Sequence, residues 1–423
     1  MENKVYPITF KKDEDYKIGG VSIPYLGEKY GTPLYILDKE TLIFQAQKYI
    51  NSWKKYYKNK YKVLFAIKAL PILEVIRIFK NYGLGALVST GGELYIALSA
   101  NVPSEDIYFH GNAKTLKEIE YAIDQKVGAI IIDNFDEYEK IKYVLSKKDT
   151  KVKVLVRIIP NIEVNTHKSI RTGQTDTKFG LPIEQALVLI EKINTEKNII
   201  FKGIHSHIGS QIFDISAYVK LSEVLSEVYK ELNSKNITVE EMSIGGGLGV
   251  AYTKEDNPPD IEDLAREVSN KFSETIGHNF KLICEPGRSL VGRAGITLYR
   301  IESRKELGIR KYVSVDGGMS DNIRPSLYGA KYSALIITKG DREEIFSIAG
   351  KHCESGDILI KDFSGLWPNP GDYLITFTTG AYNFSMYTWY NATPRPAVVL
   401  VENGKDRIIV KRENYEDLLG GQI

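Results

Sequence analysis

A lysine stands directly after a strongly apolar segment of the sequence. In YKVLFAIKAL (residues 61–70), apolar residues run almost unbroken from Val63 to Ile67, as in a strand covered on both faces, and Lys68 follows. Apolar surroundings disfavour the charged ammonium form of a lysine. The neutral amine that they favour is suited to form a Schiff base with an aldehyde cofactor. A single lysine at such a position is more often simply leaving the core. Lys68 therefore needs partners before it indicates chemistry.

Further motifs supply residue types that could be those partners. The turn GGG (residues 245–247) and the hydroxyl of Ser210 offer hydrogen-bond donors that suit a phosphate dianion. Glu285 could pair with a protonated pyridine nitrogen and keep the ring electron-poor, and His207 offers an imidazole to lie against that ring. Lysine, phosphate nest, imidazole and carboxylate together describe a site for pyridoxal 5'-phosphate.

The segment HSH permits a different interpretation, a metal-dependent hydrolase. His205 and His207 are two residues apart, so on a strand they would point to the same side, as metal ligands at strand ends do. The sequence shows no evident third and fourth ligand, and Asp133 would have to act with a distant partner. We therefore expect no metal, and we expect His110 and His352 to be polar loop residues.

Eight apolar segments that resemble strands alternate with segments of helical period. The strand segments are KVLFAI (62–67), GALVS (85–89), DIYFH (106–110), GAIIID (128–133), VKVLVRI (152–158), FKGIHSH (201–207), VEEMSI (239–244) and FKLICE (280–285). This α/β alternation matches a (β/α)₈ TIM-like barrel better than an open doubly wound sheet. The C-terminal strand ends of such barrels build the active site, and the candidate residues above lie at or after strand ends.

A second domain is expected after the barrel. From about residue 287 the helical period fades, and strand patterns separated by Gly, Pro and Asn turns follow. The early segment PLYILD (33–38) finds no position left in the barrel, so we place it with this all-β domain. The expected boundaries are 38–286 for the barrel, and 1–37 with 287–423 for a β-sandwich or β-barrel domain.

The composition limits the class of partner. The 423 residues contain 56 Lys and Arg against 54 Asp and Glu, so there is no basic excess to bind nucleic acid and no tail suited to a membrane. There are only two cysteines, and the N-terminal segment has no apolar core of signal-peptide length. We expect a cytoplasmic protein whose partners are a small molecule and a second copy of itself.

Seven motifs, in order along the chain, resemble the diaminopimelate decarboxylase family. They are FAIKAL, HSHIGSQI, GGGLGV, CEPGRSLV, DNIRPSLYGA, CESGD and GAYNFSMYTWYNATPRP. This family belongs to the barrel-type pyridoxal phosphate enzymes, which include ornithine and arginine decarboxylases. The likeness extends over essentially the whole chain, and seven motifs in register are more specific than any one of them.

The resemblance implies a role for each matching residue. Lys68 would bind the cofactor covalently, His207 would lie against its ring, and Glu285 would pair with its pyridine nitrogen. Tyr382 would contact both cofactor and substrate. The positions that would hold the cofactor phosphate or a substrate carboxylate are Ser210, Gly245, Gly246, Gly247, Gly287 and Arg288.

The β domain would supply the remaining groups. Cys353 would return a proton to the substrate carbon, and Glu354 would bind the distal amine of the substrate. In the family these two residues and Tyr382 come from the neighbouring subunit, which implies a homodimer with shared active sites. Arg324 and Tyr328 would hold the distal carboxylate.

The implied reaction is decarboxylation of meso-2,6-diaminopimelate to L-lysine and carbon dioxide, the last step of lysine biosynthesis. Arg324 favours this substrate, because ornithine ends in a lone amine whereas diaminopimelate also carries a distal carboxylate. The alternatives are a decarboxylase of ornithine, arginine, carboxynorspermidine or a similar compound, a racemase, and a non-catalytic pyridoxal phosphate carrier. A carrier would not need Cys353, Glu354 and Tyr382, and a racemase would need a second acid–base group facing Lys68.

The sequence departs from the family pattern at two places. NATPRP stands where a basic residue more often precedes PRP, and HKSIRTGQTDTKFG is a variant of a usual loop. Neither departure changes a residue to which the resemblance gives a chemical role.

Overall fold

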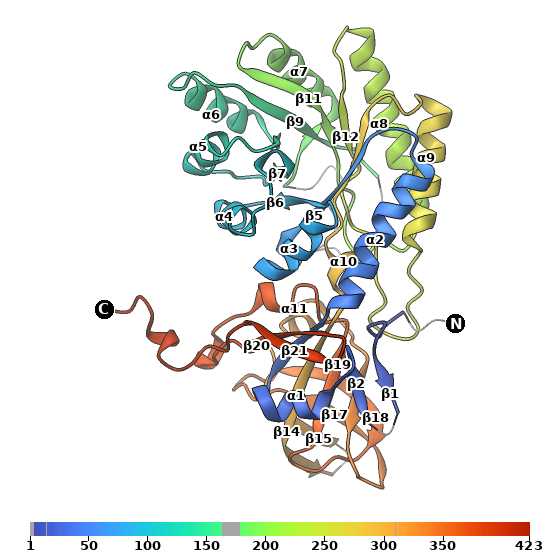
Figure 1. Ribbon diagram of the computed structural model, residues 1–423, viewed down its shortest axis with the longest axis vertical. Helices are drawn as coiled ribbons and strands as arrows, with labels where there is room; N and C mark the ends of the chain where they lie inside the picture. The colour runs from blue at the N-terminus through green and yellow to red at the C-terminus, as the bar shows by residue number, and fades with distance from the viewer. Residues whose placement is uncertain (1–3, 14, 163–177, 309) are drawn as a thin grey trace. The chain divides into compact units, whose positions relative to one another are not determined.

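The computed structural model of the protein describes residues 4–13, 15–162, 178–308 and 310–423 (Figure 1). Most of the variant loop HKSIRTGQTDTKFG therefore lies outside the described residues. The chain divides into two compact units. The β unit comprises Met1–Leu42, Val250–Asn257 and Leu290–Ile423, and the barrel unit comprises Ile43–Gly249 and Pro258–Ser289.

The barrel unit is built on eight parallel strands that close on themselves. In ring order they are β5 (Tyr61–Ala66), β6 (Gly85–Val88), β7 (Ile107–Phe109), β8 (Ala129–Ile132), β9 (Val152–Ile159), β11 (Ile199–His205), β12 (Glu241–Ser243) and β13 (Lys281–Cys284). The pairing of β13 with β5 completes the ring, and the two-residue strand β10 (Leu181–Pro182) pairs in parallel with the end of β9. The expected (β/α)₈ barrel is confirmed, because each of the eight apolar segments forms one of its strands.

Helices separate the strands, as the alternating periods indicated. They are α2 (Lys39–Tyr56), α3 (Leu73–Asn81), α4 (Gly91–Ser99), α5 (Leu116–Asp124), α6 (Phe135–Leu145), α7 (Ile183–Asn194), α8 (Ser216–Ser234) and α9 (Ile261–Thr275). The side chains of Thr90, Thr115 and Asn134 cap α4, α5 and α6 by accepting a backbone N–H of the first turn. These caps fix where the loops after β6, β7 and β8 end.

The interior of the barrel is apolar up to the strand ends. Leu64 and Ala66 of β5 belong to a buried cluster with residues of β6, β7, β8, β9 and β13. Alternate residues of a strand share one face, so this cluster marks the inward face of the sheet. No helix within the described part of the chain is both long and apolar enough to span a membrane.

The β unit contains a sheet in which the N-terminal strand is central. Strand β4 (Leu34–Asp38) is buried at all five residues and pairs with β14 (Gly295–Leu307) on one side and β20 (Ala397–Glu402) on the other. The expectation that PLYILD joins the all-β domain is thus confirmed. The other strands of this sheet are β15 (Arg310–Val315), β16 (Ala334–Ile337), β17 (Glu343–Ala349), β18 (Ile358–Leu366), β19 (Tyr373–Phe377) and β21 (Lys405–Val410).

Several short elements of the β unit were not predicted from the sequence. A three-stranded sheet joins β1 (Lys11–Lys12), β2 (Tyr16–Ile18) and β3 (Val21–Ser22), and α1 (Ile23–Tyr30) follows it directly. The side chain of Ser22 caps α1, and the buried residues Ile18, Val21, Ile23 and Leu26 join the core beneath β4 and β14. Elements of two or three residues carry too little periodicity to be read from sequence.

Candidate active site

Lys68 lies just beyond β5, in the short 3₁₀ turn Ile67–Ala69. Its two neighbours are buried, whereas Lys68 itself is exposed. The desolvation by apolar walls that we expected for this lysine is therefore not found in the structure. Its charge nevertheless reaches neighbouring groups, because burial lowers the pKa of His207 well below its usual value and the charge of Lys68 lowers it further. The charge of Lys68 is thus close enough to His207, in the loop after β11, to affect its pKa.

Glu285 follows β13 and is buried with two hydrogen-bond partners. Its Oε1 accepts the hydroxyl of Ser243 at 2.7 Å, and its Oε2 lies 3.0 Å from Nε2 of His205. Burial by itself would raise the pKa of Glu285, but His205, Ser243 and the charge of Arg157 bring that pKa below its ordinary value. The carboxylate therefore stays ionised in the barrel, as a partner for a protonated nitrogen must.

The two histidines of HSH have different surroundings. Strand β11 ends at His205, so the alternation from which we inferred a shared side for His207 does not extend to that residue. The Nδ1 atom of His205 is buried and has no hydrogen-bond partner among the described residues. His207 accepts the N–H of Gly246 at Nδ1, with a distance of 3.2 Å. Within the same residues, no three histidine, cysteine, aspartate or glutamate side chains group closely enough to hold a metal ion.

Three motifs that are distant in sequence meet beside Glu285. Arg288 donates from Nη2 to Oγ of Ser210 at 3.1 Å, which joins CEPGR to HIGS. The GGG turn packs against both motifs: a Cβ on Gly246 would lie 2.1 Å from the carbonyl oxygen of Glu285, and one on Gly247 would lie 2.1 Å from that of Gly209. Only glycine permits these close approaches. Cation, hydroxyl and glycine turn thus form one group.

The main-chain donors of the turn are partly used inside the protein. The N–H of Gly245 donates to Oγ of Ser243 at 3.1 Å, and that of Gly246 donates to His207. These two groups are therefore less available to a phosphate than the sequence suggested. A Cβ on Gly287 would lie 3.2 Å from the Cβ of Ala69, the residue after Lys68. The role of Gly287 there is to let the loop after β13 approach the turn that carries the lysine.

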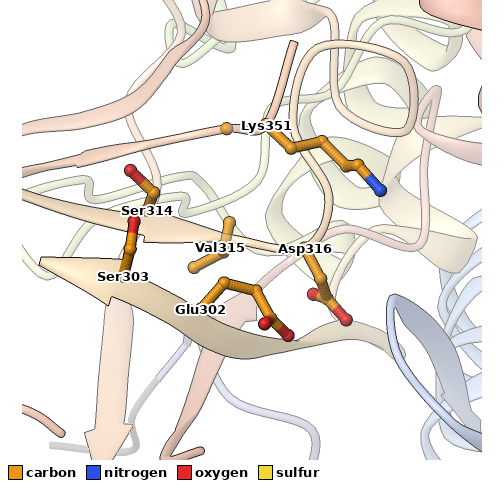
Figure 2. Close-up of a pocket in the computed structure, with 7 residues that line it drawn as sticks. Glu302, Ser303, Ser314, Val315, Asp316 and Lys351 are labelled. Carbon is orange, nitrogen blue, oxygen red and sulfur yellow. The ribbon is translucent and has the colours of Figure 1, made fainter. Parts of the chain in front are cut away.

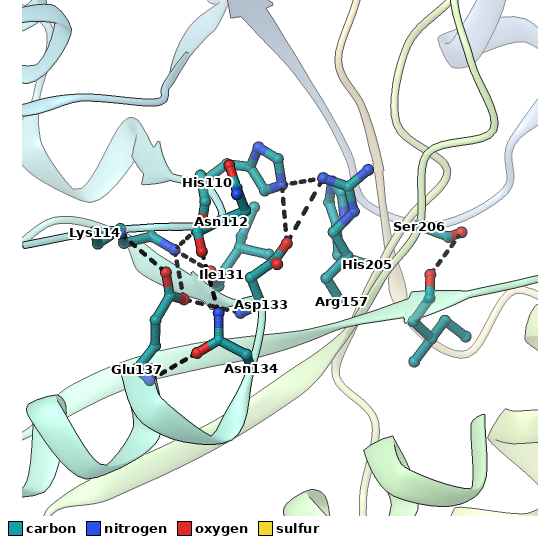
Figure 3. Close-up of polar contacts among 12 residues, drawn as sticks. His110, Asn112, Lys114, Ile131, Asp133, Asn134, Glu137, Arg157, His205 and Ser206 are labelled. Carbon is teal, nitrogen blue, oxygen red and sulfur yellow. Dashed lines mark hydrogen bonds and ion pairs between the residues drawn. The ribbon is translucent and has the colours of Figure 1, made fainter. Parts of the chain in front are cut away.

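Arg157, for which we predicted no role, is the centre of a polar cluster. Its Nη1 is hydrogen-bonded to Nε2 of His110 and lies 3.9 Å from Oδ1 of Asp133 (Figure 3). Burial lowers the pKa of Arg157 to about 10, although Asp133 and Glu285 oppose this effect. The ring of His110 also stacks on that of His205 at 5.1 Å. The cluster therefore connects the loops after β7 and β8 to the histidine that holds Glu285.

A fully buried ion pair holds these loops in place. Nζ of Lys114 donates to the carbonyl oxygens of Gly111 at 2.6 Å and Ile131 at 2.8 Å, and to Oε2 of Glu137 at 2.9 Å (Figure 3). All three ammonium donors are thus used. Oε2 of Glu137 also accepts the N–H of Asp133 at 2.9 Å. The pair sets the main chain of both loops from which His110 and Asp133 reach Arg157.

In the β unit, Arg324 lies in an aromatic environment. It begins the short helix α11 (Arg324–Tyr328) and is 7% exposed. Its Nη1 donates to the hydroxyl of Tyr332 at 2.5 Å, and its guanidinium carbon lies 4.8 Å from the ring centre of Tyr252. No carboxylate within the described ranges forms an ion pair with it. The guanidinium is therefore buried with phenols in place of a counter-ion.

The loop that carries Cys353 and Glu354 follows β17 and is exposed at both residues. Its base is buried: Nδ1 of His352 and Oδ2 of Asp357 lie 2.7 Å apart. The hydroxyl of Ser326, in α11, donates to the carbonyl oxygen of Gly356 at 2.8 Å. Since α11 contains Arg324 and Tyr328, the structure brings the DNIRPSLYGA and CESGD motifs together.

Tyr382 has the unusual backbone angle φ = +65° and is half-buried. The adjacent Asn383 is 1% exposed, and its Oδ1 accepts the hydroxyl of Tyr332 at 3.3 Å. Tyr382 thus directly precedes a residue that is connected, through Tyr332, to Arg324. Of the residues with predicted roles, five lie in the β unit and nine in the barrel unit.

A cavity of about 470 Å³ lies on the β unit (Figure 2). The residues that line it are Glu302, Ser303, Ser314, Val315, Asp316, Gly350 and Lys351. None of the residues with predicted roles is among them. Its walls come from β14, β15 and the chain after β17, and five of the seven lining residues are polar or charged.

Known proteins resemble this chain in sequence and in fold. The family model described as pyridoxal-dependent decarboxylase, pyridoxal binding domain, matches residues 45–292. The diaminopimelate decarboxylase of Synechocystis sp. is 41% identical, over 98% of this chain and 92% of that protein. The crystal structure of diaminopimelate decarboxylase from M. jannaschii superposes with a TM-score of 0.94, at 36% identity, covering 99% of this chain and 98% of that one. The crystal structure of diaminopimelate decarboxylase from Helicobacter pylori, complexed with L-lysine, superposes with a TM-score of 0.89. Its identity is 30%, and the match covers 94% of this chain and 98% of that one.

The Lys114–Glu137 pair leads to a prediction about stability. Lys114→Met should lower the free energy of unfolding by about 3–5 kcal/mol, because it leaves the carboxylate of Glu137 buried without its counter-ion. Urea denaturation followed by circular dichroism measures the change. The control is Lys148→Met, which removes a surface lysine paired with Glu120 and Asp124 and should cost at most about 1 kcal/mol. Equal losses in the two variants would contradict the structural role of the buried pair.

Proposed function

The chain belongs to the diaminopimelate decarboxylase family of pyridoxal-dependent decarboxylases, and we propose that it converts meso-2,6-diaminopimelate to L-lysine and carbon dioxide. The observation that carries the choice of substrate is the guanidinium of Arg324. A buried charge without a counter-ion is costly, so this environment favours a ligand that brings an anion. The distal carboxylate of diaminopimelate is such an anion, and ornithine has none.

The barrel unit offers a donor set that fits pyridoxal 5'-phosphate. Ser210 and Arg288, beside Gly247, combine a hydroxyl and a cation for the phosphate. Glu285 is an ionised, buried carboxylate for the pyridine nitrogen. The orphaned Nδ1 of buried His205 shows that polar capacity remains unused next to Glu285. When bound, the cofactor supplies an electron-poor ring that takes up the electron pair left when the α-carboxylate departs as carbon dioxide.

The side chains of the barrel unit have separate tasks in this proposal. Lys68 binds the cofactor covalently through Nζ, and its exposure leaves it accessible to the incoming aldehyde. Glu285 holds a proton on the ring nitrogen, because its lowered pKa keeps it an acceptor at neutral pH. His207 lies against the ring as a neutral imidazole, since burial and Lys68 lower its pKa. His205 and Ser243 keep the carboxylate of Glu285 ionised, and the positive charge of Arg157 adds to their effect on its pKa.

The β unit completes the substrate site. Arg324 and Tyr328 hold the distal carboxylate, and Glu354 accepts hydrogen bonds from the distal ammonium. After carbon dioxide leaves, Cys353 donates its thiol proton to the α-carbon, and Tyr382 contacts both substrate and cofactor. Cys353 is exposed, as a proton donor to an external ligand must be.

We further propose a homodimer that acts in the cytoplasm. Residues 38–286 bind the cofactor, and residues 1–37 with 287–423 contribute to the substrate site and the dimer interface. In each active site, Cys353, Glu354 and Tyr382 come from the partner subunit. The two free thiols, of buried Cys284 and exposed Cys353, suit a reducing compartment.

The covalent role of Lys68 gives a direct test of cofactor binding. The purified protein should be yellow, and borohydride should fix the cofactor to Lys68, because this lysine is exposed beside His207. Peptide mapping by mass spectrometry identifies the modified residue. A reduced cofactor on another lysine, or a colourless protein that contains zinc, would contradict the assignment.

Arg324 tests the choice of substrate. Arg324→Ala should lower kcat/KM for diaminopimelate by roughly 30-fold to several thousand-fold, since losing a charged hydrogen-bond partner costs about 2–5 kcal/mol. The assay measures carbon dioxide and lysine, and cofactor content should stay unchanged. L-lysine retains the distal carboxylate, so its affinity by calorimetry should fall in parallel. Arg342→Ala, at an exposed arginine, is the control. An unaltered kcat/KM for Arg324→Ala would overturn the substrate assignment.

The shared site can be tested by mixing two inactive variants. Lys68→Ala and Cys353→Ala, unfolded together and refolded, should recover about a quarter of wild-type activity, because each mixed dimer has one intact site. Each variant refolded alone is the control and should remain inactive. If both variants fold and associate but the mixture stays inactive, Lys68 and Cys353 act within one chain.

A further inference from the structure

Three side chains of residues 390–393 (YNAT) contact three consecutive residues, His352, Cys353 and Glu354, at the start of the loop that contains CESGD. Oγ1 of Thr393 lies 3.3 Å from Nε2 of His352. Oδ1 of Asn391 accepts the backbone N–H of Cys353 at 2.8 Å, and the hydroxyl of Tyr390 donates to Oε2 of Glu354 at 3.3 Å. We call residues 390–393 the clamp segment. The threonine at which the sequence departs from the family pattern is one of its contacts.

The backbone of the clamp segment is held in an unfavourable conformation. Asn391 has φ = 52° and ψ = 29°, and Ala392 also has φ = 52°. Left-handed angles are common for glycine, tolerated by asparagine and disfavoured for alanine. Such a conformation persists where surrounding contacts determine it, and it is enriched at functional sites. Here it places the side chain of Asn391 on the main chain of Cys353.

The opposite side of the loop is fixed by a buried carboxylate. Oδ2 of Asp357 accepts the backbone N–H of His352 at 3.0 Å and bonds to its ring at 2.7 Å, while Oδ1 accepts the N–H of Met319 at 2.7 Å. The ring of His352 is stacked with that of Tyr390, with centres 5.9 Å apart. The main chain before Cys353 is thus restrained from two sides. Cys353 and Glu354 are nevertheless exposed.

The loop thus combines a restrained main chain with exposed reacting residues. The side chain remains accessible to a ligand, while the backbone that sets its origin is restrained. Reaction rates depend steeply on such restraint, because small misplacements of a reacting group cause large losses. Supporting residues around a site commonly provide it.

We propose that Asn391 and Tyr390 are positioning residues for the decarboxylation. Asn391 sets the place from which the Cys353 thiol delivers its proton, and Tyr390 orients Glu354 toward the distal ammonium of the substrate. This inference rests on the proposed function. It assigns a division of labour within the clamp segment: Asn391 serves proton transfer, and Tyr390 serves substrate binding.

Two substitutions at Asn391 separate the hydrogen bond from the backbone conformation. Asn391→Gly accepts the left-handed angles but lacks the acceptor, whereas Asn391→Asp keeps an Oδ acceptor and also tolerates these angles. The matched control is Asn403→Gly. Asn403 is an exposed asparagine with φ = 48° in the turn between β20 and β21, away from the loop.

The first measurement is hydrogen–deuterium exchange of the purified holoenzyme, read by mass spectrometry in peptides that contain Cys353. Asn391→Gly should accelerate exchange at this amide by about threefold to tenfold, the range expected for loss of one hydrogen bond. Asn391→Asp and Asn403→Gly should match the wild type. This readout does not depend on turnover.

The second measurement is steady-state kinetics with diaminopimelate. Asn391→Gly should lower kcat by about tenfold with KM changed less than about twofold, because it disturbs the proton donor. Tyr390→Phe, which keeps the ring stacked on His352, should raise KM by about threefold to tenfold while kcat stays within about twofold. Asn391→Asp should restore kcat toward the wild-type value.

The outcomes distinguish the inference from the proposed function. If Asn391→Gly exchanges like the wild type, or exchanges faster without a change in kcat, Asn391 does not position Cys353 and the inference is overturned. A loss shared by Asn391→Gly and Asn403→Gly would also overturn it, as a general effect of glycine. If the wild type itself does not decarboxylate diaminopimelate, the proposed function and the catalytic assignment fail together. The exchange result would then still decide whether Asn391 holds the loop.

Discussion

Closure of the parallel sheet in the barrel unit is the constraint on which its site depends. When β13 pairs with β5, the C-terminal ends of all eight strands must lie around one rim. Lys68, His207 and Glu285 are far apart in sequence, yet each follows a strand, so closure places them on this rim. The loops between strand and helix can then bond to one another. Without the pairing of first and last strands, Glu285 and Lys68 would lie at opposite edges of an open sheet.

Buried charge is treated differently in the two units. In the barrel unit, Lys114 is paired with Glu137 and two carbonyl oxygens, and Arg157 lies near Asp133. These cations stabilise the protein's own loops and need no ligand. Arg324, in the β unit, has phenolic partners but no carboxylate among the residues described. The partners of a buried cation thus distinguish a structural role from a role in ligand binding, and only the tertiary structure shows these partners.

Local sequence patterns were sufficient for the main elements. The eight apolar segments became the barrel strands. PLYILD could be assigned to the β domain because the barrel already had eight strands. The roles of the individual site residues remain predictions. Local patterns failed where an inference required a precise element end: HSH was treated as one strand, but β11 stops at His205.

Residue type and order along the chain determined the barrel, the added all-β domain and the positions from which chemistry could arise. These inferences depend on short-range periodicity and on motifs of a few residues, which a single sequence displays directly. Tertiary structure decided which groups meet. It placed Arg157 on His110, Glu285 on His205, and Asn391 on Cys353, pairs separated by 38 to 80 residues. It also left Lys68 exposed where apolar neighbours had suggested burial. Such contacts depend on how folded segments approach one another in space, and a local sequence pattern does not contain this information.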